Sequence, residues 1–179
     1  MRAAVLGADD GIVSTTCLML GVAATAAPSQ AIVVAGLAGL VAGATSMATG
    51  EFVSVSTQRD AEAADIAREE NEQVASPGHE LDELKGIYVQ YGLDEALALQ
   101  VAQRLMEVDP LGSHLRDELG LVEQLRAKPA MAASVSAVSF ALGAALPLLV
   151  LLLTPLPHRI PALATAAVLL LGGLGALGG

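Results

Sequence analysis

The sequence predicts an all-α, multi-pass membrane protein that carries a helical, water-facing domain between its second and third membrane-spanning helices. Two stretches, 11–50 and 129–157, contain no Asp, Glu, Lys or Arg over 40 and 29 residues. The segment between them, 57–128, holds 16 of the 19 acidic side chains of the chain. This contrast predicts membrane-spanning helices in 1–56, an acidic domain in 57–128, and further membrane-spanning helices in 129–179.

The apolar stretches are long enough for four crossings of a membrane. A bilayer core of ~30 Å needs ~20 apolar residues in a helix. The first stretch therefore fits two crossings, near 9–27 and 31–54, with a turn around Pro28, where polar residues interrupt the apolar run. Two more crossings are expected at 130–153 and 160–177.

The basic residues predict how these crossings are oriented. Seven of the nine Lys and Arg lie within 57–128, and Arg2 precedes the first crossing, whereas Arg159 stands alone on the other side. Cytoplasmic segments of membrane proteins are enriched in Lys and Arg. We therefore expect the N-terminus and the acidic domain to lie in the cytoplasm.

The pattern of the acidic domain predicts helices only. Strong helix formers without a breaker indicate that the second crossing continues as one long helix until Pro77 interrupts it. Another helix is expected near 80–90, and the next one, capped by Asp94, should bury one face. A last helix is expected at 113–126 with Ser113 as its N-cap. The apolar positions of the helix after Asp94 are Leu97, Leu99, Val101, Leu105 and Met106.

Potential metal ligands recur at helical spacing in this domain. Three pairs are three or four residues apart: Glu69 with Glu72, Glu80 with Glu83, and His114 with Glu118. Such spacing places both side chains of a pair on one helix face, and helices that present such pairs to one another can surround a divalent cation. Because Cys17 is the only cysteine, the set lacks thiolate clusters and favours ferrous iron, manganese, zinc or magnesium over copper(I). The same residues also fit a solvated acidic face.

Three side chains of the first two crossings indicate a path for a metal ion. Asp10 and Glu51 are ionisable groups beside apolar stretches, where charge is costly and by default functional. Met47 adds a thioether, which together with a carboxylate favours a transition metal over magnesium or calcium. Glu51 also fits a position at the membrane boundary, and Met47 also fits a packing role.

Four segments of the sequence match the motifs of a known family of membrane proteins. They are DGIVST at 10–15, LMLGV at 18–22, ATSMATGEFVS at 44–54 and ELGL at 118–121. In these motifs the chain resembles the vacuolar iron transporter family and is similar to its bacterial-type members. The resemblance implies a homodimer in the bacterial cytoplasmic membrane that exports ferrous iron, and often manganese, from the cytoplasm in exchange for protons.

The resemblance also implies roles for individual residues. Metal binding in the acidic domain would fall on Glu69, Glu72, Glu80, Glu83 and Glu118, and the membrane pathway on Asp10 and Met47. His114 and Leu115 take the places of two methionines of the family, so the first position keeps a possible ligand. Two further acidic positions of the family are held by Ala3 and Gly39, which leaves Glu51 as the candidate for proton coupling.

The number of crossings is a further departure from the family. Its members usually have five, whereas this sequence offers four, so we expect the fifth to be absent. That absence would put transport in question without affecting metal binding by the acidic domain.

Two other classes of function are compatible with the sequence. One is a membrane-anchored buffer or regulator of divalent metal that does not transport, and the other is an acidic module that docks a basic protein. An enzyme is not expected, because the sequence has no paired nucleophile and base, phosphate loop or cofactor fingerprint. The expected partners are divalent metal ions, protons, lipid and a second copy of the chain, with no prosthetic group and no nucleic acid.

Overall fold

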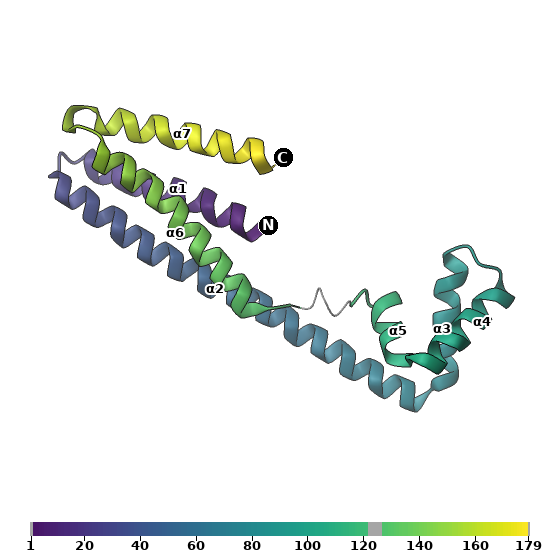
Figure 1. Cartoon of the computed structure of the whole chain (residues 1–179). Coiled ribbons are helices and arrows are strands. Elements are labelled where there is room, and N and C mark those ends of the chain that lie inside the picture. Colours follow the sequence, from purple (N-terminus) through teal and green to yellow (C-terminus); the bar gives the residue numbers. More distant parts are fainter. Residues whose placement is uncertain (1, 122–126, 179) are drawn as a thin grey trace. The chain divides into compact units, whose positions relative to one another are not determined.

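The computed structural model describes residues 2–121 and 127–178, which are mostly helical (Figure 1). The elements in chain order are α1 (Arg2–Ala23), α2 (Ser29–Ala75), α3 (Pro77–Gln90), α4 (Glu95–Val108), α5 (Pro110–Asp117), α6 (Pro129–Leu153), the short 3-10 turn η2 (Leu156–His158) and α7 (Arg159–Gly178). No β-strand occurs in the described ranges. The prediction of an all-α fold is confirmed.

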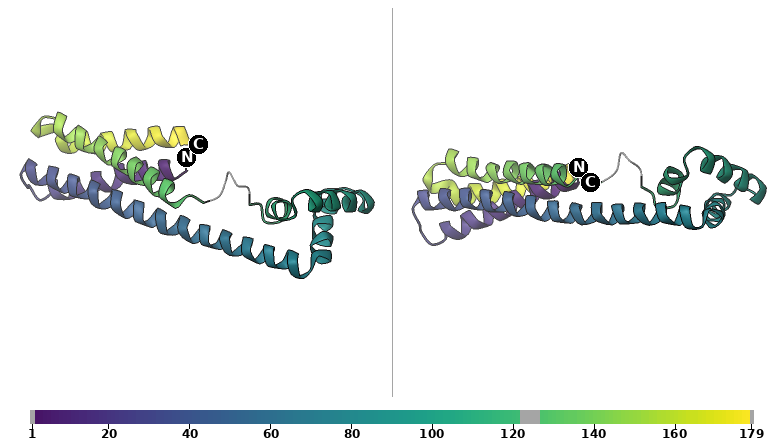
Figure 2. Two further views of the ribbon diagram at one scale, coloured as in Figure 1. Left: turned by 60° about the horizontal axis from the view of Figure 1, so that its bottom comes forward. Right: turned by 90° about the horizontal axis from the view of Figure 1, so that it is seen from below.

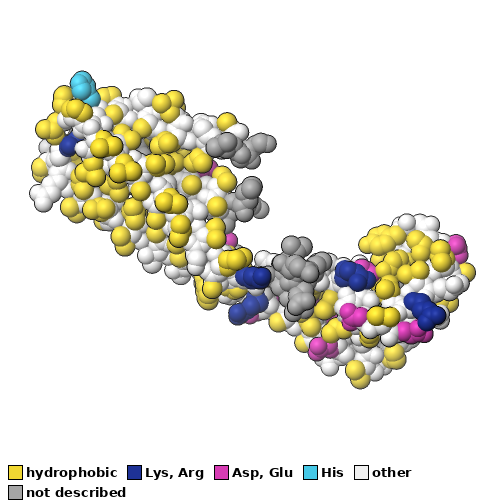
Figure 3. All heavy atoms as spheres, viewed as in Figure 1, with side chains coloured by type: hydrophobic (Ala, Val, Ile, Leu, Met, Phe, Trp, Pro, Cys, Tyr) yellow, Lys and Arg dark blue, Asp and Glu magenta, His cyan; other side chains and the backbone are white. Residues whose placement is uncertain are grey.

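The chain folds as two compact units. The first combines Met1–Val55 with Pro129–Gly179, and the second is the intervening Ser56–Lys128. Hydrophobic side chains cover the face of the first unit drawn in Figure 3, whereas acidic and basic side chains are spread over the second. The surface of the first unit therefore suits lipid, and that of the second suits water.

Four helices of the described chain are long and apolar enough to cross a membrane, as predicted. They lie in Ala4–Ala23, Ser29–Ala75, Pro129–Leu153 and Leu156–Ala176. These helices confirm the prediction of a multi-pass helical membrane protein.

The first helix lies earlier in the chain than the expected 9–27. It runs from Arg2 to Ala23, because the alanine-rich residues before the two aspartates are good helix formers. Ala26 adopts a φ of 58°, the left-handed conformation that ends helices, and Pro28 follows two residues later. The turn predicted around Pro28 is therefore present, and it begins a few residues sooner.

Glycines bring the backbones of α1 and α6 into direct contact, and the two helices pack along each other within the first unit (Figure 2). A Cβ atom on Gly11 would overlap the carbonyl oxygen of Phe140 and lie 2.8 Å from the amide nitrogen of Ala144. A Cβ atom on Gly143 of α6 would equally overlap the backbone of α1, and one on Gly7 would lie 2.9 Å from α6. Small residues four apart are a common means of close helix approach in membranes. The contacts of these three glycines were not predicted from the sequence.

One hydrophobic cluster joins all four helices of the first unit. Its buried members are Met19 of α1, Ile32 of α2, Leu148 and Leu151 of α6, and Leu163 of α7. Inside a bilayer such a cluster stabilises the helix bundle through van der Waals packing, because lipid tails are as apolar as the side chains.

The helix boundaries predicted at Pro77 and Asp94 in the second unit are confirmed. Helix α2 ends at Ala75, and Pro77 is the first residue of α3, where its missing amide hydrogen has no cost. The Asp94 carboxylate accepts hydrogen bonds of 3.0 Å from two backbone amides in the first turn of α4. Between these helices, Gly92 takes a φ of 97° and reverses the chain.

The buried face of α4 is close to the expected one. Leu99, Val101, Leu105 and Met106 are half-buried, whereas Leu97 is 47% exposed and Ala98 and Ala102 are fully buried. Helices α3 and α4 pack against each other, and alanine lets them approach more closely than leucine would. Hydrophobicity therefore predicted most of the face but missed the two fully buried alanines.

The prediction that Ser113 is an N-cap is wrong. Asp109 caps α5, and its carboxylate accepts a 3.0 Å hydrogen bond from the amide of Gly112. Ser113 lies inside the helix, where its buried hydroxyl donates to the Asp109 carbonyl oxygen. Helix α5 ends at Asp117, and the part of the expected helix at 122–126 lies outside the described residues.

The contact between α1 and α6 can be tested with two glycines of one helix. Gly11→Ala should destabilise the first unit by about 1–3 kcal/mol, because the added methyl group has no space against α6. Gly21→Ala is the matched control: nothing lies within 4 Å of a Cβ there, so the change should be neutral or slightly stabilising. Thermal unfolding of the full chain in detergent, followed by circular dichroism, measures both. Equal stability of the two variants would contradict the close contact.

Candidate metal site

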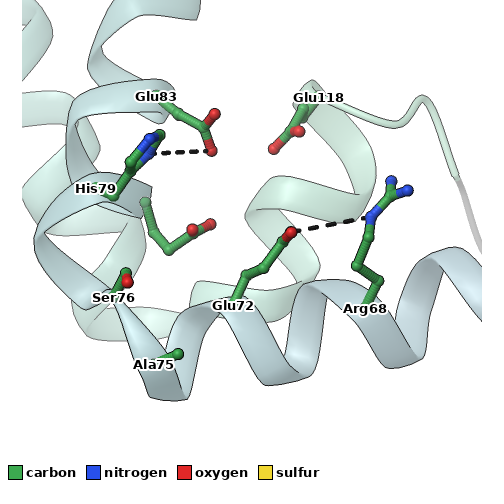
Figure 4. A pocket seen from close by; sticks show the side chains of 8 residues that line it. Arg68, Glu72, Ala75, Ser76, His79, Glu83 and Glu118 are labelled. Atoms are coloured by element: carbon green, nitrogen blue, oxygen red, sulfur yellow. Dashed lines mark ion pairs between the residues drawn. The ribbon is translucent and has the colours of Figure 1, made fainter.

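A pocket of about 510 Å³ opens in the second unit between the ends of α2, α3 and α5 (Figure 4). It is lined by Arg68, Glu72, Ala75, Ser76, His79, Glu80, Glu83 and Glu118. Half of these residues are glutamates, and each glutamate is one of the predicted metal ligands. The spacing of the glutamates predicted that these helices would present carboxylates to one another. In the structure they do.

Glu69, Glu80 and His114 form a buried group in the same unit. They are 2%, 3% and 0% exposed, and each offers a ligand atom within 4.8 Å of the others. The Nδ1 atom of His114 lies 2.9 Å from Oε2 of Glu118, 3.3 Å from Oε1 of Glu69 and 3.8 Å from Oε2 of Glu80. One imidazole nitrogen therefore faces three carboxylates, which come from α2, α3 and the end of α5.

This buried group is poorly satisfied without a further positive charge. Burial raises the pKa of Glu80, the negative charges of Glu69 and Glu83 raise it further, and His114 acts in the opposite direction. Oε2 of Glu80 and Nε2 of His114 are buried without a hydrogen-bond partner among the described residues. Burying a polar atom without a partner costs free energy. A cation held between the carboxylates would remove part of that cost.

The other two predicted glutamates line the pocket and face basic side chains. Oε2 of Glu72 lies 3.9 Å from Nε of Arg68, and Oε2 of Glu83 lies 3.7 Å from Nδ1 of His79. Figure 4 shows the carboxylates of Glu83 and Glu118 pointing toward each other across the pocket. The six predicted residues thus lie in one part of the fold, some in the buried group and some on the pocket wall.

His79 was not among the predicted residues. The sequence carries a signal for it, since His79 precedes Glu80 directly and stands four residues before Glu83, which puts it on the same helix face as Glu83. Its side chain is 68% exposed at the first turn of α3.

A hydrogen-bonded latch outside the pocket connects α3 to α5. The hydroxyl of Tyr88 donates to Oδ2 of Asp117 at 2.6 Å, and Arg116 holds the same carboxylate with two bonds of 2.7 and 2.8 Å. The bonds from Arg116 lower the pKa of Asp117, while burial and the hydrogen bond to Asp117 raise the pKa of Tyr88. Because Asp117 lies next to Glu118 and three residues after His114, this latch positions both of these predicted ligands against α3.

The residues predicted for the membrane pathway are not gathered into a comparable site. Asp10 is exposed on α1, whereas Met47 and Glu51 are half-buried on α2. Neither carboxylate belongs to a group of three potential metal ligands within the described part of the chain. Their role stays a prediction.

The fold and the pocket define a multi-pass helical membrane protein with an acidic helical unit whose carboxylate and imidazole donors suit a divalent transition metal. The chain belongs to the VIT family, whose profile matches residues 1–179.

Relatives that match nearly the whole of this chain carry names that agree with this family. The chain is 41% identical over 179 residues to a vacuolar iron transporter of Acanthamoeba castellanii, covering 99% of this chain and 66% of that protein. It is 40% identical over 176 residues to vacuolar iron transporter homolog 1 of Oryza sativa subsp. japonica, covering 98% and 58%. Homolog 2 of the same plant is 38% identical over 180 residues, covering 100% and 73%. The chain thus spans less than two thirds of the length of the first two relatives.

The latch can be tested by removing one hydroxyl group. Tyr88→Phe should destabilise the second unit by about 1–2 kcal/mol, because it deletes a hydrogen bond to a charged acceptor. Both tyrosines of the chain lie in this unit and no tryptophan is present, so tyrosine fluorescence during urea unfolding reports on this unit alone. Tyr91→Phe is the control, because Tyr91 is 67% exposed and contacts Tyr88 through its ring.

The pKa shifts of the latch predict how the difference in free energy of unfolding between wild type and Tyr88→Phe depends on pH. The pKa of Asp117 is lowered from 3.8, so its contribution is complete above that value and is lost as the pH falls through the lowered pKa. The pKa of Tyr88 is raised from 10.0, so its contribution is lost only as the pH rises through the raised pKa. The difference between Tyr88→Phe and wild type should therefore stay constant from about pH 5 to pH 9. A difference that vanishes within this window would argue against the latch.

Proposed function

We propose that this protein is a membrane transporter that exports ferrous iron, manganese or both from the cytoplasm in exchange for protons. The observation that carries the proposal is the buried group of Glu69, Glu80 and His114, in which the two carboxylates form no ion pair with a Lys or Arg of the described residues. The names of the relatives, vacuolar iron transporters, support a metal ion as the transported substrate.

Metal capture is the first step of the proposed mechanism. An ion entering the pocket meets Glu72, Glu83 and Glu118 on its wall and then the buried carboxylates behind them. Burial raises the pKa of Glu80, and the negative charges of Glu69 and Glu83 raise it further, so a bound ion stabilises the charged carboxylate and protons compete with the ion for it. Metal binding and proton release are thereby linked at one residue.

The donor atoms favour transition metals over the abundant divalent cations of the cytoplasm. Carboxylate oxygens bind magnesium and calcium as well as manganese and iron, but imidazole nitrogen suits iron, zinc and other transition metals. His114, fully buried beside Glu69 and Glu118, supplies that nitrogen. Zinc is therefore expected to bind to this site as well as iron and manganese.

Passage through the membrane is assigned to Asp10, Met47 and Glu51. In the proposed pathway the carboxylates exchange metal for protons, and the thioether disfavours hard ions. Asp10 is exposed on α1 in the single chain, so a second copy packed in the lipid would be needed to enclose it, and we propose a homodimer. The distribution of Lys and Arg supports a cytoplasmic position for the N-terminus and the second unit. The resemblance to bacterial-type members supports the bacterial cytoplasmic membrane as the location.

Two other functions predict different results in measurements of metal binding and metal transport. A metal buffer or regulator would bind ions in the second unit and show no flux across a membrane. An acidic interaction module would bind a basic protein in a salt-sensitive manner and gain no stability from metal.

Metal binding is tested by neutralising one buried carboxylate. Glu80→Gln should weaken binding of Mn²⁺ to the full chain in detergent at least tenfold, which is about 1.4 kcal/mol of binding free energy. The reason is that the substitution removes a charged ligand that belongs to both groups of potential ligands, the buried one and the one with His79 and Glu83 on the pocket wall. Glu70→Gln is the control: Glu70 is exposed on the same helix as Glu69 and does not line the pocket, so affinity should be unchanged. Isothermal titration calorimetry measures both, and equal affinities would contradict the assignment.

The same substitution should make the metal-free protein more stable at pH 7. A raised pKa in the folded state means that the stability linked to Glu80 is complete below 4.5 and is lost as the pH rises through the raised value. Glutamine stays neutral and keeps that stability at neutral pH. Opposite effects on stability and on affinity are the expected signature of a carboxylate that is retained for binding an ion.

Transport is tested in proteoliposomes that contain the full chain. Under an imposed proton gradient, wild-type protein should move Fe²⁺ and Mn²⁺, and Asp10→Asn should reduce the flux at least tenfold, about 1.4 kcal/mol in the barrier. Asp9→Asn neutralises the neighbouring carboxylate and is expected to leave the flux intact. Metal binding at the second unit should persist in both variants. Binding without flux in the wild type would instead select the buffer.

A further inference from the structure

One residue of α6, Phe140, touches both of the first two helices. A Cβ atom on Gly43 of α2 would overlap Cζ of its ring and lie 2.8 Å from Cε2. A Cβ atom on Gly11 of α1 would overlap its carbonyl oxygen. Phe140 is accordingly 1% exposed. Its backbone is held against α1, and its ring fills the notch that the missing side chain of Gly43 leaves in α2.

Two contacts give the direction of the seam along which α2 faces α6. Gly43 meets the ring of Phe140, and a Cβ atom on Gly36, earlier in α2, would lie 2.6 Å from Cδ2 of Leu148, later in α6. Moving back along α2 thus corresponds to moving forward along α6. The two helices run antiparallel, and the residues after Gly43 face the residues before Phe140.

The ring lies beside two residues of the proposed pathway. Asp10 directly precedes Gly11, so Asp10 and Phe140 lie at one level of the bundle. Met47 follows Gly43 by about one turn and is on the same face of α2. An ion that comes along α2 from its later residues therefore reaches Met47 first and the ring one turn further on.

Side chains close the seam beyond the ring, whereas α2 stands free before it. A Cβ atom on Gly36 would lie 2.6 Å from Sδ of Met19 and from Cδ2 of Leu148, and both side chains belong to the hydrophobic cluster of the first unit. At Gly50, by contrast, nothing lies within 4 Å of a Cβ atom. From this end of α2, Gly43 is thus the first glycine whose notch is filled.

Buried hydroxyl groups lie on both sides of the ring. Ser136, about one turn before Phe140, and Thr15 and Thr16, about one turn after the contact on α1, are at most 3% exposed and have no hydrogen-bond partner among the described residues. The exposed Ser14 instead donates to a carbonyl oxygen of its own helix. An unpaired buried hydroxyl costs free energy. The three buried groups are therefore available to an ion or a water molecule that passes along the helices.

We propose that Phe140 is the gate of the transport pathway. With its ring in the notch at Gly43, an apolar barrier separates Met47 and Asp10 from the far side of the bundle, and such a constriction excludes water and hydrated ions. Passage requires that the ring leave the notch, either by turning or because α2 moves away. The inference rests on the transport part of the proposed function and adds the residue that keeps the pathway from opening to both sides at once.

A leak of protons in the absence of metal tests the gate. The full chain is reconstituted into proteoliposomes with valinomycin and potassium, and an enclosed pH dye follows the collapse of an imposed pH gradient. Phe140→Ala should speed this collapse roughly tenfold over wild type, because the barrier in the seam is lost. Phe140→Leu keeps an apolar side chain near the notch and should leak less. A purely structural role predicts weaker Mn²⁺ transport without a leak.

Matched variants separate an open gate from a loosened bundle. Leu163→Ala also removes a fully buried side chain from the first unit, near the start of α7, and should lower thermal stability without a leak. Gly43→Ala leaves Phe140 in place but puts a methyl group where its ring lies, so it should leak as well. Gly50→Ala is the control on the same helix and should stay tight, since its methyl group meets nothing.

The outcomes separate this inference from the proposed function. Proton-coupled Mn²⁺ transport by wild type, together with tight Phe140→Ala and Gly43→Ala vesicles, overturns the gate and leaves transport standing. A leak in Leu163→Ala as fast as in Phe140→Ala also overturns it, because lost packing then explains both. No Mn²⁺ transport by wild type overturns the transport function and the gate with it. Thermal unfolding by circular dichroism verifies folding, and Phe140→Leu with Gly43→Ala decides the question if Phe140→Ala does not fold.

Discussion

Carboxylates crowded around one imidazole nitrogen repel each other, and the architecture of the second unit has to hold them together against that repulsion. Glu69, Glu80 and Glu118 all approach Nδ1 of His114, and the carboxylates come from three different helices. Burial raises the pKa of Glu80 and the charges of Glu69 and Glu83 raise it further, so its ionised form has a free-energy cost in the metal-free fold. The proposed ion-binding site would therefore be formed before the ion arrives, at the expense of local stability.

The stability that offsets this cost comes from contacts that lie outside the pocket. Tyr88 and Arg116 hold Asp117 with short hydrogen bonds, and the carboxylates of Asp94 and Asp109 cap α4 and α5. None of these acidic groups faces the pocket, so the unit separates carboxylates that fix helices from carboxylates that face the cavity. This separation lets acidic side chains of the unit serve the fold as well as the proposed binding site.

Part of this structure could be predicted from the sequence because it depends on local chemistry. The length of uncharged stretches defined the membrane-spanning helices, Pro77 marked a boundary and Asp94 marked a cap. Glutamates three residues apart were expected on one helix face, and the structure brings Glu69, Glu80 and Glu118 around His114. These features need only a helix and its periodicity.

The features that could not be predicted depend on how helices meet. Which of the 18 glycines contact another backbone is decided by the crossing of α1 and α6, and the sequence does not show that crossing. Ala98 is buried and Leu97 is exposed because α3 approaches one side of α4 closely. The cap of α5 was expected at Ser113 and lies at Asp109, four residues earlier, because both residue types favour that position and the local pattern does not separate them.

The close crossing of α1 and α6 has a consequence for the angular position of Asp10. Gly7 and Gly11, the two α1 glycines that touch α6, bracket Asp10 within little more than one turn of helix. Backbone contacts on both sides of Asp10 thus fix the direction in which its Cα–Cβ bond points from α1. Rotamer changes at other residues leave that direction unchanged. One residue inserted between the glycines would rotate the C-terminal part of α1 by about 100° relative to its first turns. Between the two glycines, α1 should tolerate exchanged side chains better than changes in length.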